Sequence, residues 1–372
     1  MPERAARLRT TAGTALTVAA LTCAMSLATQ LPAVAAGCAH PKIKVLDRPA
    51  SQPYGNGAVF ALGRGTISAG SSGGLPVYWI GKDPVRVPFP AGYTTGAVNA
   101  INKHGLMAGY VRSTATGIDV AFSYRIGAAK AKILPGGSYA ADVNDHGDIV
   151  GGNVMVNPYT AYIWHGGTVK RQLTVPARYE LIAVSGINND GTVVGDGAYD
   201  QPGASNQAIV GLVWPGDPAQ PAFHLLPVDN SPDTGVTIIP EDIDNNGRIV
   251  GQKQDYNISA AYETFWDAPY TAPGAQLAGL PGYHDEGYFY GSSPSSGLVA
   301  GEAPDILHGD NPVGTAQIWA GSGPIRALPR LAPNGRSAAY AAADNGNVGG
   351  SAADANGTAQ PVIWTCAVRQ AL

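Results

Sequence analysis

The chain repeats one short pattern seven times, and this repetition restricts its fold more than any other feature of the sequence. Each copy has a turn-forming segment, a Gly, three residues with an apolar one in the middle, and a second Gly. A short apolar strand ending in Trp or Tyr follows after nine to nineteen residues. The best copies occupy 101–109, 143–151, 187–195 and 243–251. Such a repeat indicates that one supersecondary unit is used many times.

The aromatic residues that end the copies recur every 40 to 53 residues. They are Trp79, Tyr124, Trp164, Trp214, Trp266, Trp319 and Trp364. This period suits a four-stranded propeller blade. In one unit we expect strands at 139–143, 148–152, 160–164 and 169–175, with Asn and Gly in the first turn. The sequence therefore predicts an all-β fold, a seven-bladed β-propeller of four-stranded blades.

The last copy ends after its third strand, and its fourth strand is expected from the other end of the chain. Lys42–Pro49 resembles the fourth-strand segments at 129–135 and 324–329. We therefore expect this N-terminal strand to complete the last blade. Copies one, six and seven depart from the pattern, for example with Pro294 in the Asn position. Six or eight blades are the alternatives to seven.

Residues 1–36 have the features of an export signal, because three Arg residues precede an uncharged, apolar and Thr/Ala-rich stretch. We expect their removal, which leaves residues 37–372 as one secreted, extracellular domain. The segment 35–38 is one residue short of a lipobox, so a lipoprotein is the alternative. No other stretch is long and apolar enough for a membrane span.

Composition narrows the classes of partner. The formal net charge is −4, which argues against nucleic acid as a ligand. The 49 Gly and 29 Pro residues, with few charges and no long helical periodicity, favour an all-β chain rich in turns. We expect a monomer without a cofactor.

Cysteines give a separate indication of ring closure. Export would remove Cys23 and leave Cys38 and Cys366 in an oxidising compartment. Cys38 lies shortly before the expected fourth strand of the last blade, and Cys366 lies shortly after its third strand. Both cysteines therefore fall where other blades have the turn between their third and fourth strands. We therefore predict a Cys38–Cys366 disulfide; two free thiols or an intermolecular bridge are the alternatives.

The best copy carries a family resemblance. Residues 134–151 read Leu-Pro-Gly-Gly-Ser-Tyr-Ala-Ala-Asp-Val-Asn-Asp-His-Gly-Asp-Ile-Val-Gly, which resembles the HAF family of extracellular repeats. That family has a Gly-Gly-Ser…Ala-x-x-Ile-Asn-x-x-Gly-x-Val-Val-Gly unit, then a His-Ala-Phe-like strand with a Trp. Here that strand reads Val-Ala-Phe-Ser-Tyr at 120–124 and Thr-Ala-Tyr-Ile-Trp at 160–164, without the His. The resemblance covers most of 54–366 and implies secretion and repeats, but supplies no catalytic residue.

Two residue types that suggest ligands have simpler structural interpretations. The Asn/Asp-rich turns lack the spacing of a strong calcium loop, so we expect turn chemistry and no metal site. The recurrent Trp residues suit carbohydrate stacking, but packing between blades explains their regular position better.

Five Tyr residues lie at the corners between successive blades, each a few residues after a Pro. They are Tyr54, Tyr93, Tyr139, Tyr179 and Tyr283. The corners share one face with the loops between second and third strands, a face on which many propellers bind ligands. These tyrosines are candidate ligand-binding residues, and the alternative is that each anchors its loop through packing or its hydroxyl.

The segment 283–290 departs most from the repeat. His284, Asp285 and Glu286 could supply an acid and a base for attack on a glycosidic or uronic linkage. His308, in a later loop of the same copy, is a further ligand-binding candidate. Solvated loop polarity is the alternative, and adjacent strand residues such as His284 and Asp285 face opposite sides.

These observations favour a secreted scaffold that binds an extracellular or cell-wall ligand, and a glycan is the favoured ligand class. An enzyme is less favoured; it would be a polysaccharide lyase or glycoside hydrolase that uses the 283–310 region. A cell-surface protein-binding module is the third hypothesis. Fold alone does not decide between them.

Overall fold

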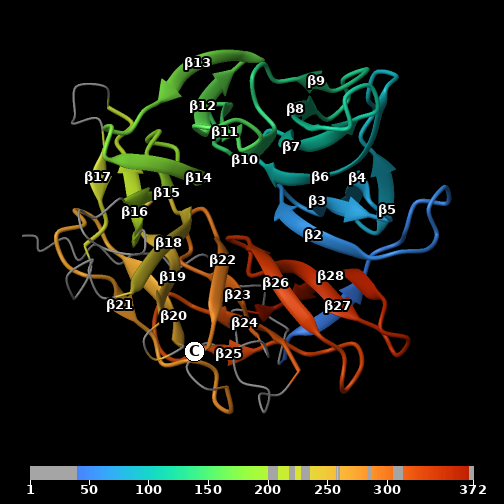
Figure 1. Cartoon of the computed structure of the whole chain (residues 1–372). Coiled ribbons are helices and arrows are strands. Elements are labelled where there is room, and N and C mark those ends of the chain that lie inside the picture. The colour runs from blue at the N-terminus through green and yellow to red at the C-terminus, as the bar shows by residue number, and fades with distance from the viewer. Residues whose placement is uncertain are drawn as a thin grey trace, which may run out of the picture. The chain divides into compact units, whose positions relative to one another are not determined.

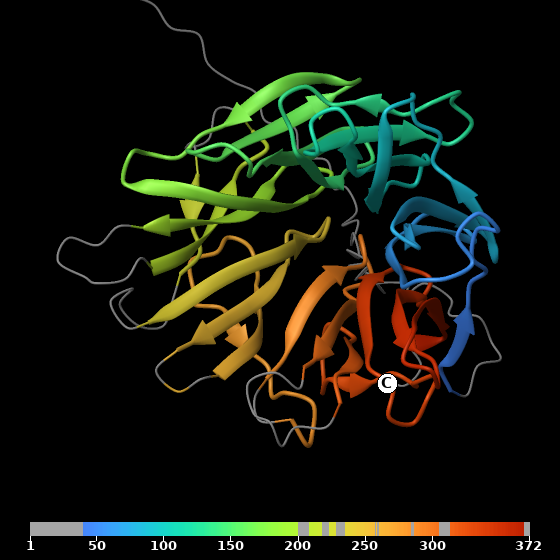
Figure 2. The same cartoon turned by 45° about the vertical axis from the view of Figure 1, so that its right-hand side comes forward.

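The computed structural model describes residues 40–199, 208–217, 223–227, 235–256, 258, 260–283, 286–304 and 313–367. All of them belong to one compact unit, Ala35–Leu372, which is described by itself. It consists of seven four-stranded antiparallel sheets in a ring, as Figures 1 and 2 show. Among the described residues no helix is long and apolar enough to cross a membrane.

The strands follow one another blade by blade. They are β1 (Lys42–Val45); β2 (Gly57–Leu62), β3 (Ile67–Ser72), β4 (Leu75–Ile80) and β5 (Asp83–Arg86); β6 (Tyr93–Ile101), β7 (Leu106–Ser113), β8 (Asp119–Arg125) and β9 (Lys132–Ile133); β10 (Tyr139–Val143), β11 (Asp148–Asn153), β12 (Thr160–His165) and β13 (Thr168–Leu173); β14 (Tyr179–Ile187), β15 (Val193–Tyr199), β16 (Ala208–Trp214) and β17 (His224–Leu225); β18 (Val236–Ile243), β19 (Ile249–Asp255), β20 (Ala260–Trp266) and β21 (Ala275–Gln276); β22 (Tyr288–Ser292), β23 (Val299–Ala303), β24 (Thr315–Trp319) and β25 (Arg326–Ala327); and β26 (Ser337–Ala342), β27 (Val348–Ala353) and β28 (Ala359–Thr365). Blades one to six thus begin at β2, β6, β10, β14, β18 and β22, and blade seven begins at β26.

The N-terminal strand closes the ring. β1 pairs antiparallel with β28, with Lys42 opposite Thr365 and Val45 opposite Val362. The seventh sheet therefore has the order β1, β28, β27, β26, and β1 is its outer strand. The predicted propeller of seven four-stranded blades is confirmed, including its completion by the N-terminal strand.

Two glycines of each repeat meet different geometric demands, as blade two illustrates. Gly105, the first glycine, has φ of +72° in the turn between β6 and β7, a conformation that other residues adopt at a cost. Gly109, the second, pairs with Val98 beside a bulge in β6. A Cβ at Gly109 would lie 2.1 Å from the Ala97 carbonyl oxygen. The first glycine therefore forms the turn, and the second admits the bulge.

The recurrent Trp residues pack between blades, as expected. Trp164 is fully buried and shares a cluster with Ala108 of blade two and Ile149 of its own blade. Its Nε1 donates to the Pro135 carbonyl at 3.0 Å. Burial of an aromatic side chain of this size removes roughly 150–250 Å² from water. All six Trp residues are at most 2% exposed and lie in the core.

Candidate functional site

The inner strand of every blade has an irregularity in its register at the same place, and β6 and β14 each have a second one nearer their start. At this β-bulge, one extra residue of the inner strand has no direct partner on the next strand. The bulge residues form a ring of seven positions, which we call the bulge ring: Phe60, Asn99, Ala141, Ser185, Glu241, Tyr290 and Tyr340. All seven are partly exposed and line one central cavity.

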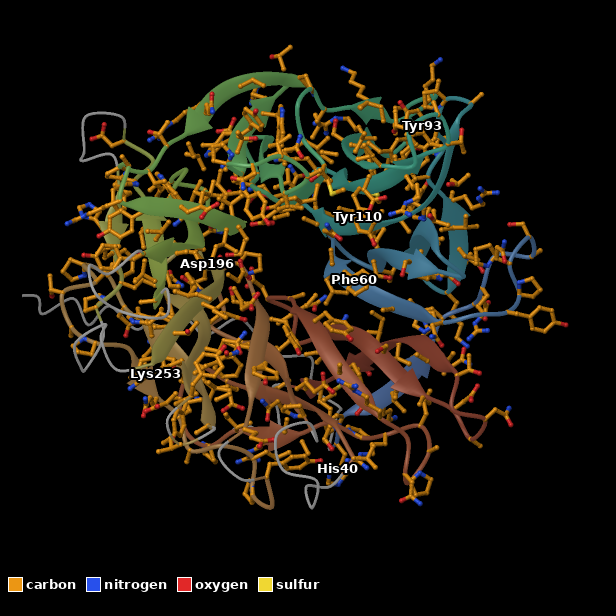
Figure 3. The ribbon with its side chains drawn as sticks, in the orientation of Figure 1. His40, Phe60, Tyr93, Tyr110, Asp196 and Lys253 are labelled. Carbon is orange, nitrogen blue, oxygen red and sulfur yellow. The ribbon has the colours of Figure 1, made fainter. Side chains whose placement is uncertain are left out.

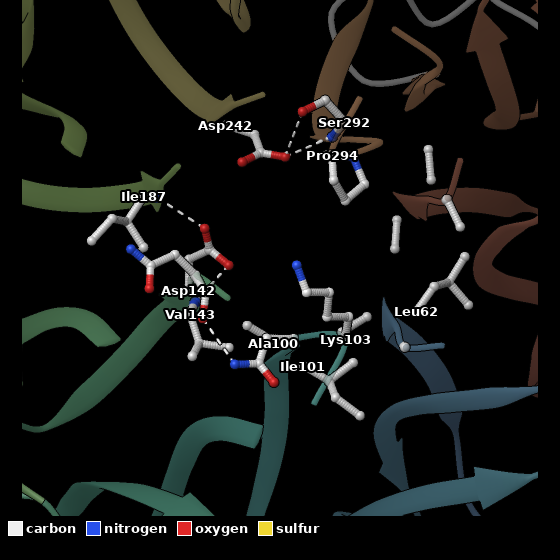
Figure 4. Close-up of a pocket in the computed structure, with 18 of the residues that line it drawn as sticks. Leu62, Ala100, Ile101, Lys103, Asp142, Val143, Ile187, Asp242, Ser292 and Pro294 are labelled. Atoms are coloured by element: carbon white, nitrogen blue, oxygen red, sulfur yellow. Dashed lines mark hydrogen bonds between the residues drawn. The ribbon is translucent and has the colours of Figure 1, made fainter. Parts of the chain in front are cut away.

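The cavity has a volume of about 570 Å³ and receives residues from all seven blades. It extends from the bulge ring to the turns that follow the inner strands, as the close-up in Figure 4 shows in part. A volume of this size lies within the range of roughly 300–1,000 Å³ that is typical of small-molecule sites. Sequence reasoning did not predict this site, although the second Gly of each repeat was the signal for the bulges.

Three adjacent members of the bulge ring form an aromatic arc. The ring centroids of Phe60 and Tyr340 lie 5.2 Å apart, and those of Tyr340 and Tyr290 lie 5.5 Å apart. The Tyr290 hydroxyl donates to Glu302 Oε2 at 3.5 Å. Burial raises the pKa values of both tyrosines, so both hydroxyls stay protonated near neutral pH. We call Tyr290, Tyr340 and Phe60 the aromatic arc.

Polar side chains from other blades form the wall of the cavity opposite the aromatic arc. Asn99 Nδ2 donates to the Ala140 carbonyl at 2.9 Å, and Ser185 Oγ donates to the Pro240 carbonyl at 2.7 Å. Glu241 accepts from Gln252 Nε2 at 3.2 Å. Burial, opposed by this hydrogen bond and reinforced by nearby Asp196, raises the pKa of Glu241 to about 7.

Asp196 of β15 is the most isolated carboxyl near the cavity. Its residue is 7% exposed, and it forms no hydrogen bond within the described part of the chain. Burial raises its pKa to about 7. Figure 3 shows Asp196 and Phe60 on opposite sides of the central opening. The Asp196 carboxyl oxygens are not among the fully buried side-chain atoms that lack a partner, so they keep some contact with solvent-accessible space.

Two further carboxyls, Asp142 and Asp242, connect neighbouring blades. Asp142 Oδ2 accepts from the Ile187 amide at 2.9 Å, and Asp242 Oδ2 accepts from the Ser292 amide at 2.7 Å (Figure 4). Burial raises the pKa of Asp142, and burial with repulsion from Asp142 raises that of Asp242 to about 7. A Cβ at Gly186 would lie 3.0 Å from Asp242 Oδ1, so a glycine leaves space there.

The turn Asn of the repeat has a second role that sequence reasoning missed. Asn144 Oδ1 accepts from the His146 and Asp148 amides within its own turn, at 3.1 and 3.0 Å. Its Nδ2 donates at 3.0 Å to the Asn188 carbonyl of the next blade. Asn102 donates to the Asn144 carbonyl in the same way, and Asn188 to that of Asp244. We call these three bonds the Asn ladder.

Charges at the turn end of the cavity are largely paired. Lys103 Nζ lies 2.9 Å from Asp145 Oδ2. Asp344 Oδ1 accepts from the Ser295 and Ser296 amides at 2.8 Å. In the described part of the chain, no group of three or more His, Cys, Asp or Glu side chains is arranged to hold a metal ion.

The corner tyrosines are mostly engaged with neighbouring segments. The Tyr139 hydroxyl accepts from the Val184 amide at 3.0 Å, and the Tyr283 hydroxyl donates to the Val313 carbonyl at 2.7 Å. Tyr179 is buried against Phe223, and Tyr93 lies against Phe89. Tyr54 alone of the five is largely exposed, at 82%.

The predicted catalytic segment is described only in part. His284, Asp285 and His308 lie outside the described residues. Glu286 is fully buried, and its backbone forms a bridge with Ala261 of blade five. Glu302 is 2% exposed and lies 2.8 Å from Arg336 Nε.

The predicted signal segment and one cysteine of the predicted disulfide lie outside the described residues. Residues 1–36 and Cys38 lie outside them. Cys366 directly follows Thr365, which pairs with Lys42. The chain therefore passes close to Cys366 four residues after Cys38, and the disulfide stays a prediction.

Comparison with known proteins supports the fold. The chain is similar to the β-propeller domain of the Trilobed protease from Pyrococcus furiosus, which is described as having an open velcro topology. The two are 11% identical with a TM-score of 0.56, over 84% of this chain and 94% of that chain. No family model matches the sequence, and no curated protein matches it. At this identity the likeness shows the fold alone, and the HAF resemblance stays a prediction.

Proposed function

We propose that the protein is an exported, HAF-like binding scaffold and that its central cavity holds part of an extracellular or cell-wall glycan. The β-propeller commonly serves as a binding scaffold, and the ligand class is our proposal. The aromatic arc carries the proposal, because it lies across the cavity from hydrogen-bonding side chains. Aromatic faces pack on the apolar surfaces of sugar rings, while amide, hydroxyl and carboxyl groups bind sugar hydroxyls.

The cavity supports this proposal better than the corner tyrosines do. The hydroxyls of Tyr139 and Tyr283 are already bonded to backbone groups, and Tyr179 is buried. Tyr139 connects blade three to blade four, Tyr179 packs on aromatic rings of its own blade, and Tyr283 fixes the segment that precedes β24 of blade six. The arc tyrosines, in contrast, occupy bulge positions, and a bulge turns a side chain away from the regular face of its sheet.

We do not extend the proposal to lyase or hydrolase chemistry. Of the acidic residues described in that region, Glu286 is fully buried and Glu302 is bonded to Arg336. A carboxyl must lie within hydrogen-bonding reach of the bond that it cleaves. Export itself rests on the charge and apolar pattern of residues 1–36.

Depletion from solution tests the proposal. Purified mature chain is incubated with insoluble cell wall, chitin and cellulose, with inert beads as the control surface. We expect selective depletion by at least one glycan, and at least a tenfold loss of affinity in Tyr340→Ala, because stacking surface is removed. Tyr340→Phe should keep most of the affinity, since it retains the ring.

Tyr54→Ala is the matched control, because Tyr54 is exposed and does not line the cavity. Thermal unfolding of each variant separates loss of binding from loss of fold. No depletion by any glycan would overturn the proposal and favour a surface protein as the partner. Equal affinities of Tyr340→Ala and the parent chain would place a glycan site outside the cavity.

A further inference from the structure

We infer that a second, smaller pocket, which lies between blades two and three, binds a phosphate group. The pocket has a volume of about 240 Å³ and shares no lining residue with the central cavity. This volume lies below the range of roughly 300–1,000 Å³ that is typical of sites for whole small molecules, which favours a compact charged group. The inference goes beyond the glycan proposal and does not depend on it, because it concerns another site.

The charged lining of this pocket is basic. Its Lys and Arg residues are Arg125, Lys130 and Lys132. Two His residues also line the pocket, and no Asp or Glu of the described chain does. None of the three basic side chains forms an ion pair with a described residue. A cleft lined by charges of one sign attracts the opposite charge, even in a protein whose formal net charge is −4.

The carboxyls beside the pocket are already paired. Asp148 lies 2.8 Å from His165 Nδ1 and 2.7 Å from Lys170 Nζ. Asp145 lies 2.9 Å from Lys103 Nζ. These two carboxyls therefore offset charges other than those of the three basic lining residues.

Strand pairing places polar side chains of blade two on the face that meets blade three. Ser123 of β8 lies directly opposite Lys132 of β9, so both side chains project from the same face of the sheet. Arg125 follows Ser123 by two residues on β8 and shares this face. So does Ala121, which packs in one cluster with Trp164 of blade three. The hydroxyl and two of the basic groups therefore lie on the side of the interface between the two blades.

Contacts hold two of the basic side chains at the pocket. A Cβ at Gly167 would lie 3.4 Å from Lys132 Cδ, so the Lys132 side chain reaches the turn between β12 and β13 of blade three. Arg125 Nη1 donates to the His104 carbonyl at 3.1 Å. The guanidinium has five N–H donors, so this bond positions it and leaves donors for a ligand.

Ser123 gives the pocket a buried polar group without a partner. The residue is 6% exposed, and its hydroxyl forms no hydrogen bond with another described residue. The hydroxyl is not among the fully buried side-chain atoms that lack a partner, so it keeps contact with solvent-accessible space. Ser123 lines the pocket, and the pocket is therefore where a ligand can bond this hydroxyl.

A phosphate group suits this set of donors better than a carboxylate. Arg, Lys and hydroxyl groups all donate to phosphate oxygens, and hydrogen bonds between ionised partners are the strong ones. A phosphate monoester carries about −1.5 to −2 charges at neutral pH and three acceptor oxygens. A carboxylate carries one charge and two oxygens, so it matches fewer of the donors.

Titration calorimetry at low ionic strength tests the inference with inorganic phosphate, glucose 6-phosphate, glucuronate and glucose. We expect both phosphates to bind the mature chain, glucuronate to bind about tenfold more weakly, and glucose not to bind this pocket. Tighter binding of inorganic phosphate would identify the free ion as the ligand. Tighter binding of glucose 6-phosphate would identify a phosphorylated sugar.

Lys132→Gln and Ser123→Ala should each weaken phosphate binding by about fivefold to tenfold, because each removes one donor to a charged group. Lys44→Gln is the matched control. Lys44 is an exposed residue of β1, the outer strand of blade seven, as Lys132 is an exposed residue of the outer strand of blade two. This control should bind phosphate as the parent chain does, and so should Tyr340→Ala, which alters only the central cavity.

Failure of both phosphates to bind would overturn the inference and leave the glycan proposal untouched. Equal affinities for glucuronate and the phosphates would overturn the choice of phosphate. Equal weakening in Lys132→Gln and Lys44→Gln would show a general attraction of anions to the surface instead of a site. Unchanged phosphate affinity in both Lys132→Gln and Ser123→Ala would place any phosphate site outside this pocket.

Discussion

Asp196, a single buried residue of β15, reduces the stability of the folded chain as pH rises. Asp196 has its pKa raised to about 7 by burial, while an Asp in the unfolded chain titrates near 3.8. The folded state therefore binds the proton more tightly. Between these two pKa values the unfolded chain is ionised and the folded chain is protonated, so this group lowers the free energy of unfolding as pH rises from about 4 to about 7.

Asp196→Asn should therefore stabilise the protein by an amount that depends on pH. Asn cannot ionise, so the variant escapes this loss, and its advantage should grow from pH 4.5 to pH 8 by on the order of 2–4 kcal/mol. Urea denaturation at the two pH values measures the advantage. Any effect of the amide itself is the same at both pH values. A difference that does not change with pH would contradict the raised pKa of Asp196.

Replacing the second Gly of a repeat by Ala adds one methyl group and tests whether the bulge requires a glycine. In Gly109→Ala the new Cβ would lie 2.1 Å from the Ala97 carbonyl oxygen and 3.0 Å from Val98 Cα. Because these atoms are backbone, we expect a loss of about 3 kcal/mol or more in the free energy of unfolding. Gly117→Ala is the control, because it has φ of +68° with no atom near the new Cβ, and it should cost about 1–2 kcal/mol. Similar losses for both would contradict the close approach.

At the scale of the element, the turns after the inner strands act as connections between blades. Each Asn of the ladder fixes its own turn with Oδ1 and holds the next blade with Nδ2. Blade five has Asp244 in this position. Asp244 Oδ1 still accepts from the Asn246 and Arg248 amides, but a carboxylate has no second donor group. Blade five is instead connected to blade six by the backbone, because the Asn245 backbone N–H donates to the Pro294 carbonyl.

Asn144→Asp separates the two functions of this turn. The carboxylate can still accept within the turn, as Asp244 does, but it cannot donate to the Asn188 carbonyl. Because the side chain is buried, we expect the free energy of unfolding to fall by about 1–3 kcal/mol. Asn356→Asp is the control, because this exposed turn residue should change stability by less than about 0.5 kcal/mol. Chemical denaturation of both variants measures the difference. An Asn144→Asp variant with the same free energy of unfolding as the parent chain would argue against the ladder.

The sequence predicted the turns but not the ladder or the bulge ring, and the reason is physical. Asn and Gly restrict the backbone locally, so a single copy of the repeat indicates its own turn. The bond from Asn144 to Asn188 depends on the distance between two blades, which no single repeat specifies. The same holds for the aromatic arc, since Tyr290, Tyr340 and Phe60 become neighbours only when the ring closes.

At the scale of the whole molecule, closure by β1 decides whether seven repeats form one stable ring. The prediction of this closure succeeded because the last repeat lacked one strand and residues 42–49 resembled one. The pairing of Ile43 with Trp364 brings the first and last strands together. Blade count followed from the same reasoning, although copies one, six and seven departed from the pattern. Their first glycines, Gly65, Gly297 and Gly346, all have positive φ and keep the common turn.

The predicted Cys38–Cys366 disulfide would make this closure covalent. Pairing of Lys42 with Thr365 already holds the two ends together, so the bridge would restrict the unfolded chain far more than the folded one. Across a loop of about 300 residues, the chain-entropy model gives a stabilisation on the order of 5 kcal/mol. We expect reductant to lower the urea midpoint of the mature chain strongly, and Cys366→Ser to lower it equally without responding to reductant. Peptide mapping without reduction should recover the linked pair. A midpoint that reductant leaves unchanged would mean that β1 closes the ring through its hydrogen bonds and packing alone.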